Sequence, residues 1–157
     1  MNIMENKYFN IVLVEPEIPQ NTGNIARLCA CTKSNLYIVG KTGFSMTSKY
    51  MKRSGLDYWD NVNLIKIDTI EELIEKNREH TFYYLTTKSN KKYTEVKFNS
   101  GDFLVFGPET RGLKEELLNN NKEFAITIPM AKNQRSLNLS NSVAIVLYEA
   151  IRQNDIL

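Results

Sequence analysis

The stretch SLNLSNS, residues 136–142, joins an apolar, strand-like run that ends at Pro129 to an apolar helix predicted over 143–151. Small polar side chains alternate in it with single aliphatic residues, where a buried strand gives way to a buried helix. A connection of this kind needs only one turn residue and one helix cap. The surplus of hydrogen-bonding groups predicts a ligand site, because α/β proteins bind ligands at strand ends.

Strand-like and helical segments alternate along the chain. Short apolar runs bounded by Gly, Pro or polar residues predict strands over 9–14, 36–39, 62–67, 81–85, 103–106 and 124–128. Amphipathic or apolar runs predict helices over 22–32, 70–78, 114–118 and 143–151. This alternation is typical of an α/β fold, with a mostly parallel sheet flanked by helices. No repeat or linker divides the 157 residues, so we expect one domain over 1–157.

The composition predicts a globular, cytoplasmic domain without a metal. Hydrophobic residues make up 42% of the chain and charged residues 24%, which is too apolar for a disordered protein. No apolar run approaches the ~20 residues of a membrane span, and the first residues lack a signal-peptide core. Cys29 and Cys31 lie two apart on a predicted helix and point to different faces, and the single His80 completes no metal site.

Basic and aromatic residues are interleaved in two polar stretches, although the net charge is only +2. The first stretch contains Lys41, Lys49, Tyr50, Lys52, Arg53, Tyr58 and Trp59; the second contains Lys88, Lys91, Lys92, Tyr93 and Lys97. Lysines neutralise phosphates, and aromatic rings stack on unpaired bases, so both stretches are candidates for RNA contact. Solvated loops without a ligand are the alternative at this point.

The first strand-to-helix loop, residues 15–27, also carries more polar groups than a simple turn needs. Asn21 can cap the helix, with Arg27 on its exposed side. Alternatively, a helix start at Asn21, Gly23 and Asn24 presents free N–H groups to an anion, and Arg27 adds a forked cation.

A second such loop lies over residues 106–113. Gly107 and Gly112 bracket a sharp turn and allow the backbone to approach a ligand closely. Glu109 between them can cap the following helix, or it can bind a cation or a ribose hydroxyl. Both interpretations stay open for this carboxylate.

In the opening stretch, Ser140 or Asn141 can cap the helix, which leaves the polar side chains of Ser136 and Asn138 unexplained.

The polar residues of these loops match no familiar nucleotide-binding or hydrolase signature. No G-x-G-x-x-G follows a strand and no G-x-x-x-x-G-K-[ST] occurs, which argues against a dinucleotide-dependent oxidoreductase and a P-loop protein. A serine hydrolase would have to recruit His80, which nothing nearby marks as a base.

Three segments in order resemble the motifs of a known enzyme class. NTGNIAR (21–27), FGPETRGL (106–113) and the segment 128–141, which runs from IPM to SLNLSN, are similar to motifs one, two and three of the SPOUT-class RNA ribose methyltransferases. Within that class, the chain most resembles the tRNA wobble-nucleotide 2′-O-methyltransferases. The similarity covers nearly the whole chain, including 55–58 and 85–88.

The resemblance implies both a fold and a cofactor. The C-terminal part of the sheet would be threaded into a trefoil knot, a rare exception among protein folds. S-adenosylmethionine (S-adenosyl-L-methionine) would bind in a bent form to backbone groups of the knotted loops. Aliphatic walls suit its flat adenine. The positions that match the family's cofactor contacts are Leu85, Gly107, Ile128, Ser136 and Leu137.

The implied reaction moves a methyl group from S-adenosylmethionine to the ribose 2′-hydroxyl of nucleotide 34, in the anticodon loop of tRNA, with leucine tRNAs as the expected substrates. Arg27 matches the family's catalytic arginine, and Asn21, Glu109 and Asn138 match residues near the substrate ribose. Since a guanidinium is not deprotonated in proteins, Arg27 is better suited to grip a phosphate and polarise the ribose than to act as a base.

The chain shows no RNA-binding domain beside these motifs, so we expect a homodimer whose catalytic domains recognise tRNA themselves. The candidate RNA contacts are Lys49, Lys52, Arg53, Lys88 and Lys91. The resemblance places the dimer surface on the first helix and on Val143, Ala144, Val146 and Leu147 of the last. The alternatives are the same chemistry on another tRNA or rRNA ribose, and a non-catalytic RNA-binding relative.

Overall fold

All the strands described in the structure run parallel in one sheet. The computed structural model describes residues 7–53 and 61–157. The strand order is β3-β2-β1-β5-β4-β6, and each neighbouring pair is parallel. The bounds are β1 (Asn10–Val14), β2 (Asn35–Val39), β3 (Asn63–Ile67), β4 (Phe82–Leu85), β5 (Phe103–Phe106) and β6 (Ala125–Ile126). The predicted α/β architecture is confirmed.

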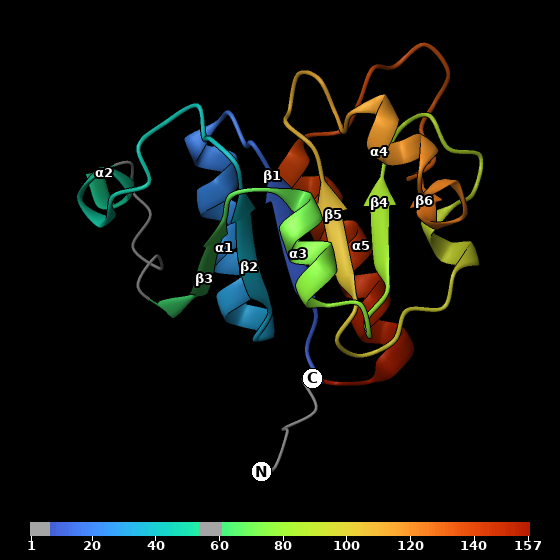
Figure 1. Cartoon of the computed structure of the whole chain (residues 1–157), viewed down its shortest axis with the longest axis horizontal. Coiled ribbons are helices and arrows are strands. Elements are labelled where there is room, and N and C mark those ends of the chain that lie inside the picture. The colour runs from blue at the N-terminus through green and yellow to red at the C-terminus, as the bar shows by residue number, and fades with distance from the viewer. Residues whose placement is uncertain (1–6, 54–60) are drawn as a thin grey trace.

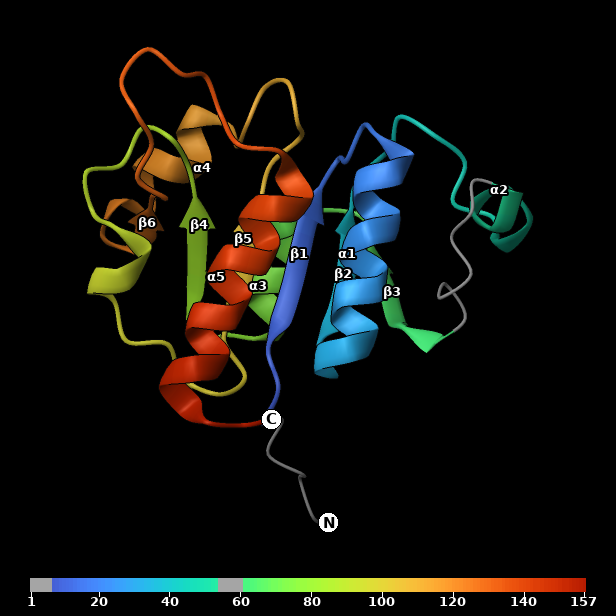
Figure 2. The same ribbon diagram turned by 180° about the vertical axis from the view of Figure 1, so that it is seen from behind.

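Helices cover both faces of the sheet. α1 (Pro19–Thr32) and α5 (Leu139–Asn154) lie side by side on one face, as Figure 2 shows. α3 (Ile70–Lys76) and α4 (Glu115–Asn119) pack on the other face (Figure 1). α2 (Ser48–Arg53) lies beyond the β3 edge, and two 3₁₀ helices, η2 (Tyr93–Glu95) and η3 (Lys122–Phe124), flank β6.

Successive side chains along each strand point to opposite faces of the sheet, so the core has two layers. In β1, Ile11 and Leu13 belong to the cluster under α1 and α5, whereas Val12 belongs to the cluster under α3. All three side chains are almost fully buried, because helices cover the sheet on both sides. The continuous apolar runs of the central strands are explained by this double burial.

The C-terminal helix corrects the expected dimer surface. Val143, Val146 and Leu147 have no exposed surface, because they pack inside the monomer against the sheet and α1. The outer side of α5 instead presents Ile145 and Tyr148, which are 36% and 49% exposed. The assignment of the three buried residues to a dimer contact is therefore wrong.

Several boundaries also differ from the sequence predictions. α1 begins three residues earlier than expected, and α5 begins at Leu139 instead of 143. The last strand has only the two residues of β6. The polar stretch around Lys49 contains the helix α2, which was not predicted, and the expected motif 55–58 lies outside the described residues.

The segment 127–138 positions the candidate site. It leads the chain from β6, at the edge of the sheet, to α5, which packs against α1 and β5 near its centre. Figure 2 shows it passing above the carboxyl ends of the strands. The trefoil knot implied by the resemblance stays a prediction. Among residues 7–53 and 61–157, no helix has the length and apolar character to cross a membrane.

Candidate functional site

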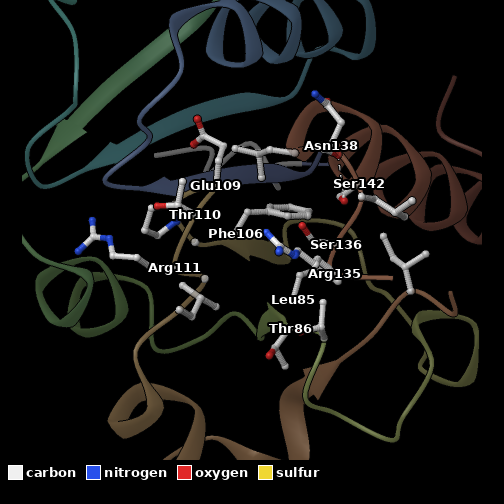
Figure 3. A pocket seen from close by; sticks show the side chains of 18 of the residues that line it. Leu85, Thr86, Phe106, Glu109, Thr110, Arg111, Arg135, Ser136, Asn138 and Ser142 are labelled. Atoms are coloured by element: carbon white, nitrogen blue, oxygen red, sulfur yellow. Dashed lines mark hydrogen bonds between the residues drawn. The ribbon is translucent and has the colours of Figure 1, made fainter. Parts of the chain in front are cut away.

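A cavity of about 660 Å³ lies at the carboxyl ends of β4, β5 and β6. In a parallel sheet these ends meet at one edge, which is where open α/β folds bind ligands. Figure 3 shows side chains from four chain segments that surround the cavity. They come from 85–88, 106–113, 127–130 and 135–142, and Ile18 and Asn21 complete the wall.

The five residues predicted to contact a cofactor lie around this one cavity. Leu85 ends β4, Gly107 directly follows β5, and Ile128 follows β6, so adjacent strands deliver them to the same edge. Ser136 and Leu137 enter from the segment before α5. The structure thus brings together residues that are up to 52 positions apart in sequence, as Leu85 and Leu137 are. Their roles toward a cofactor stay predictions.

Gly107 is required by the closeness of its own loop. A Cβ atom at this position would lie 2.4 Å from both the Gly112 carbonyl carbon and the Leu113 nitrogen. The loop folds back because Gly112 has a φ of +68° and donates its N–H to the Pro108 carbonyl oxygen at 2.9 Å. A narrow ring of backbone therefore forms the cavity wall after β5.

Asn138 caps α5 and also reaches across to α1. Its Oδ1 accepts hydrogen bonds from the backbone N–H of Ser140 at 2.9 Å and of Asn141 at 3.3 Å. Its Nδ2 donates to Oδ1 of the buried Asn21 at 3.0 Å. The expectation that Ser140 or Asn141 is the cap is wrong, because both residues donate to the cap instead.

Substitution of Asn138 separates these two roles. Asn138→Asp keeps an acceptor for the helix start and adds a favourable charge there, but it loses the donor to Asn21. We expect its melting temperature to stay near that of the wild type, while the methyl transfer that the resemblance implies falls about 10-fold or more, since Asn21 loses its partner. Asn138→Ala should lose the same activity and, in addition, about 1 kcal/mol of stability. Full methyl transfer by Asn138→Asp would contradict this assignment.

Glu109 holds the loop before α1, not the helix that follows it. Its carboxylate accepts from the backbone N–H of Glu17 at 3.0 and 3.2 Å and from that of Ile18. The residue that precedes α4 is Lys114, so capping by Glu109 is wrong. The carboxylate also lines the cavity, and its predicted role toward a ribose is untested.

The start of α1 differs from the expected anion site. The helix begins at Pro19 after Ile18, so Gly23 and Asn24 lie inside it and do not form its free end. Asn21 is buried and lines the cavity. Arg27 is exposed on a later turn of α1 and is not among the residues that line the cavity of its own subunit.

The predicted RNA contacts lie on two separate parts of the surface. Lys88 lines the cavity, with Nζ 3.3 Å from the Glu115 carboxylate, and exposed Lys91 donates Nζ to the Glu123 carbonyl at 2.9 Å. Lys49, Lys52 and Arg53 belong to α2, beyond the opposite edge of the sheet (Figure 1). The monomer does not bring the two groups together.

The cavity has polar residues that the sequence did not single out. Arg135, Thr86 and Arg111 line it, and Figure 3 shows the Arg135 guanidinium beside Phe106 and Ser136. Arg135 directly precedes the opening polar stretch, and this position was the only available signal. In the described ranges 7–53 and 61–157, no group of His, Cys, Asp or Glu side chains could hold a metal ion.

Comparison with known protein families matches residues 8–148 to the SpoU rRNA Methylase family. The chain belongs to this family. A tRNA (cytidine(34)-2'-O)-methyltransferase from Methylovorus glucosotrophus is 47% identical over 148 residues, which cover 94% of this chain and 96% of that protein. The protein of the same name from Escherichia coli K12 is 45% identical over 145 residues, 92% of each chain.

A solved structure supports the same relationship. It is described as "Structural insights into the 2-OH methylation of C/U34 on tRNA" and matches with a TM-score of 0.85 and 39% sequence identity. The match covers 94% of this chain and 97% of that chain. The resemblance of the chain to RNA ribose methyltransferases is confirmed by these findings together with membership of the SpoU rRNA Methylase family.

Proposed function

We propose that this SpoU family member transfers a methyl group from S-adenosylmethionine to the ribose 2′-hydroxyl of nucleotide 34 in tRNA. The observation that carries the proposal is the convergence of the three motif loops on one cavity. Support also comes from relatives named tRNA (cytidine(34)-2'-O)-methyltransferase at 45–47% identity over nearly the full chain. Leucine tRNAs, the enzyme's cytoplasmic location and its single domain over 1–157 are further parts of the proposal.

The residues around the cavity suit S-adenosylmethionine. The cavity volume of about 660 Å³ lies within the roughly 300–1,000 Å³ that is typical of small-molecule sites. Leu85, Ile128 and Leu137 supply aliphatic surface for the adenine, and the backbone ring at Gly107 supplies N–H and C=O groups. Ser136 adds a hydroxyl at the wall. When bound, the cofactor supplies a methyl group that its sulfonium already activates.

The protein then mainly has to orient the ribose and assist loss of a proton. Asn138 fixes the Asn21 amide by donating to its Oδ1, which leaves the Asn21 Nδ2 group to bind an oxygen of the substrate. Arg27 cannot accept the proton, because a guanidinium stays protonated in proteins. We assign to it the binding of a neighbouring phosphate through its forked donors, with solvent taking the proton.

The RNA surface is proposed to form in a homodimer. Lys88 lines the cavity, and the Lys91 carbonyl accepts from the N–H of the lining residue Thr127, whereas Lys49, Lys52 and Arg53 lie on α2. Two copies joined through the outer side of α5 would add basic surface beside each cavity and bring more phosphates of the anticodon loop within reach. The exposed Ile145 and Tyr148 supply apolar area for this contact.

The proposed activity is tested by incubating the purified chain with total tRNA and S-adenosylmethionine labelled on its methyl group. We expect label in tRNA, mapped to the 2′-oxygen of nucleotide 34. Label at another tRNA position or in ribosomal RNA would support the same chemistry on a different substrate. No label, with RNA binding intact, would identify a non-catalytic RNA-binding protein and overturn the proposal.

The dimer has its own test. Tyr148→Glu places a charge on the exposed side of α5, where it should not disturb the core because the side chain is 49% exposed. We expect sedimentation at micromolar concentration to show a dimer for the wild type and a monomer for this variant. Leu157→Glu, at another exposed apolar residue, is the control and should remain dimeric. A monomeric wild type would contradict the arrangement.

A further inference from the structure

Two glutamates join two neighbouring loops at the cavity in a reciprocal arrangement. Glu109, after β5, accepts from the backbone N–H groups of Glu17 and Ile18, before α1. In return, the Glu17 carboxylate accepts from the Thr110 N–H at 3.0 Å and from the Thr110 hydroxyl at 2.8 Å. We call these four residues the Glu17–Glu109 clasp. Each loop thus supplies one carboxylate and the backbone donors for the other.

Further contacts surround the clasp on both sides. The Pro16 carbonyl oxygen accepts from the Gly43 N–H at 3.0 Å. A Cβ atom on Gly43 would lie 3.1 Å from the backbone carbonyl oxygen of Glu17. On the other side, Arg111 Nη2 lies 3.4 Å from the Glu15 carboxylate. The hydrogen bonds from Thr110, with a contribution from the Arg111 charge, lower the pKa of Glu17. Glu17 is therefore a charged acceptor at neutral pH.

The clasp lies between the two halves of the proposed site. Thr110 is three residues after Gly107, in the loop that would hold the cofactor, and Glu17 is four residues before Asn21, at the start of the helix that carries Arg27. The proposed methyl transfer assigns no step to Glu17 or to the contacts of its carboxylate. We propose that Glu17 is a positioning residue, which fixes the cofactor loop 107–112 against the ribose-binding start of α1. This inference rests on the proposed methyl transfer.

A positioning role predicts a specific kinetic defect. Each reactant still has its own binding groups when Glu17 is replaced, but their mutual alignment is lost, and a misplacement of about 1 Å can cost up to about 100-fold in rate. For Glu17→Ala we expect single-turnover methyl transfer to fall roughly 10- to 100-fold, while the separate affinities for S-adenosylmethionine and for tRNA change less than about threefold. Glu17→Gln keeps an oxygen for Thr110 and should recover part of the rate.

The partner residue offers an independent check. Thr110→Val removes the hydroxyl donor and keeps the backbone N–H, so we expect a smaller rate loss than for Glu17→Ala. The double variant should be no slower than Glu17→Ala alone, because both changes remove the same contact. Glu75→Ala is the matched control, since this exposed glutamate on α3 pairs with Arg78 and lies outside the cavity lining.

Hydrogen–deuterium exchange gives a readout without any substrate. In Glu17→Ala the Thr110 amide should exchange faster than in the wild type, and the Ile18 amide should follow because the clasp is reciprocal. A wild-type rate for Glu17→Ala, or equal losses of rate and of cofactor affinity, would overturn the positioning role. If the wild type methylates no RNA, the proposed function fails and the positioning role falls with it. If the wild type is fully active and Glu17→Ala is unaffected, only the positioning role is overturned and the proposed function stands.

Discussion

Gly107→Ala is expected to destabilise the protein and to abolish tight cofactor binding at the same time. The added Cβ would lie 2.4 Å from two backbone atoms, at Gly112 and Leu113, so the loop itself has to move by about 1 Å to reach ordinary contact. Overpacking of this kind costs about 1–3 kcal/mol, and at this chain length each kcal/mol lowers the melting temperature by roughly 2–4 °C. Thermal unfolding measures this part of the prediction.

The same movement displaces the backbone groups that would hold S-adenosylmethionine. Loss of one or two hydrogen bonds, at about 1–1.5 kcal/mol each, weakens binding roughly 10- to 100-fold. Calorimetric titration with the cofactor measures the change, and methyl transfer should fall at least as much.

Gly112→Ala is the matched control for this substitution. It makes the same chemical change in the same loop, but no atom lies within 4 Å of its added Cβ. Its cost is the left-handed backbone alone, about 1–2 kcal/mol, so the stability loss should be comparable and the affinity loss smaller. If Gly107→Ala bound the cofactor as tightly as the wild type does, the ring after β5 would not be the cofactor cradle.

The contrast between these two glycines shows what the sequence can and cannot predict. Both were singled out, because Gly and Pro at a strand end mark a turn. The contact that makes Gly107 irreplaceable involves backbone atoms five and six residues later, whose path depends on the folded loop. The five cofactor candidates came from the resemblance to the methyltransferase motifs. Leu85, Gly107 and Ile128 meet at the cavity because each lies at or just after a strand end, and strand ends in a parallel sheet share one edge.

The sequence predicted helix boundaries wrongly where the group that stabilises the helix end comes from a distant part of the chain. α1 starts at Pro19, where the neighbouring N–H groups of Glu17 and Ile18 bind Glu109, about 90 residues away. No local pattern contains that acceptor. The helix α2 was missed for a related reason: it is short and mostly polar, and the full burial of Met51 supplies its anchor.

Arg27→Lys is expected to lose most methyl transfer while leaving the fold and cofactor binding intact. The side chain is exposed on α1, so lysine is accommodated without a packing change. Lysine keeps the charge but not the planar fork that binds phosphate through two parallel hydrogen bonds. Loss of one charged hydrogen bond, about 1.5–3 kcal/mol, predicts a rate roughly 10- to 150-fold lower. Single-turnover transfer at saturating cofactor measures it, and full turnover would exclude a bidentate role.

The position of Arg27 adds a second expectation, which subunit mixing tests. Asn21, on the same helix, lines the cavity of its own subunit, whereas Arg27 does not. In a homodimer we therefore expect Arg27 to serve the cavity of the partner subunit. At limiting cofactor, the Arg27→Ala and Gly107→Ala homodimers should each have strongly reduced activity. A heterodimer formed from both holds one cavity with an intact cofactor loop and an intact arginine from the other chain. Activity recovered on mixing would show that Arg27 acts in the cavity of the partner subunit. Heterodimers without recovered activity would show that Arg27 acts in the cavity of its own subunit.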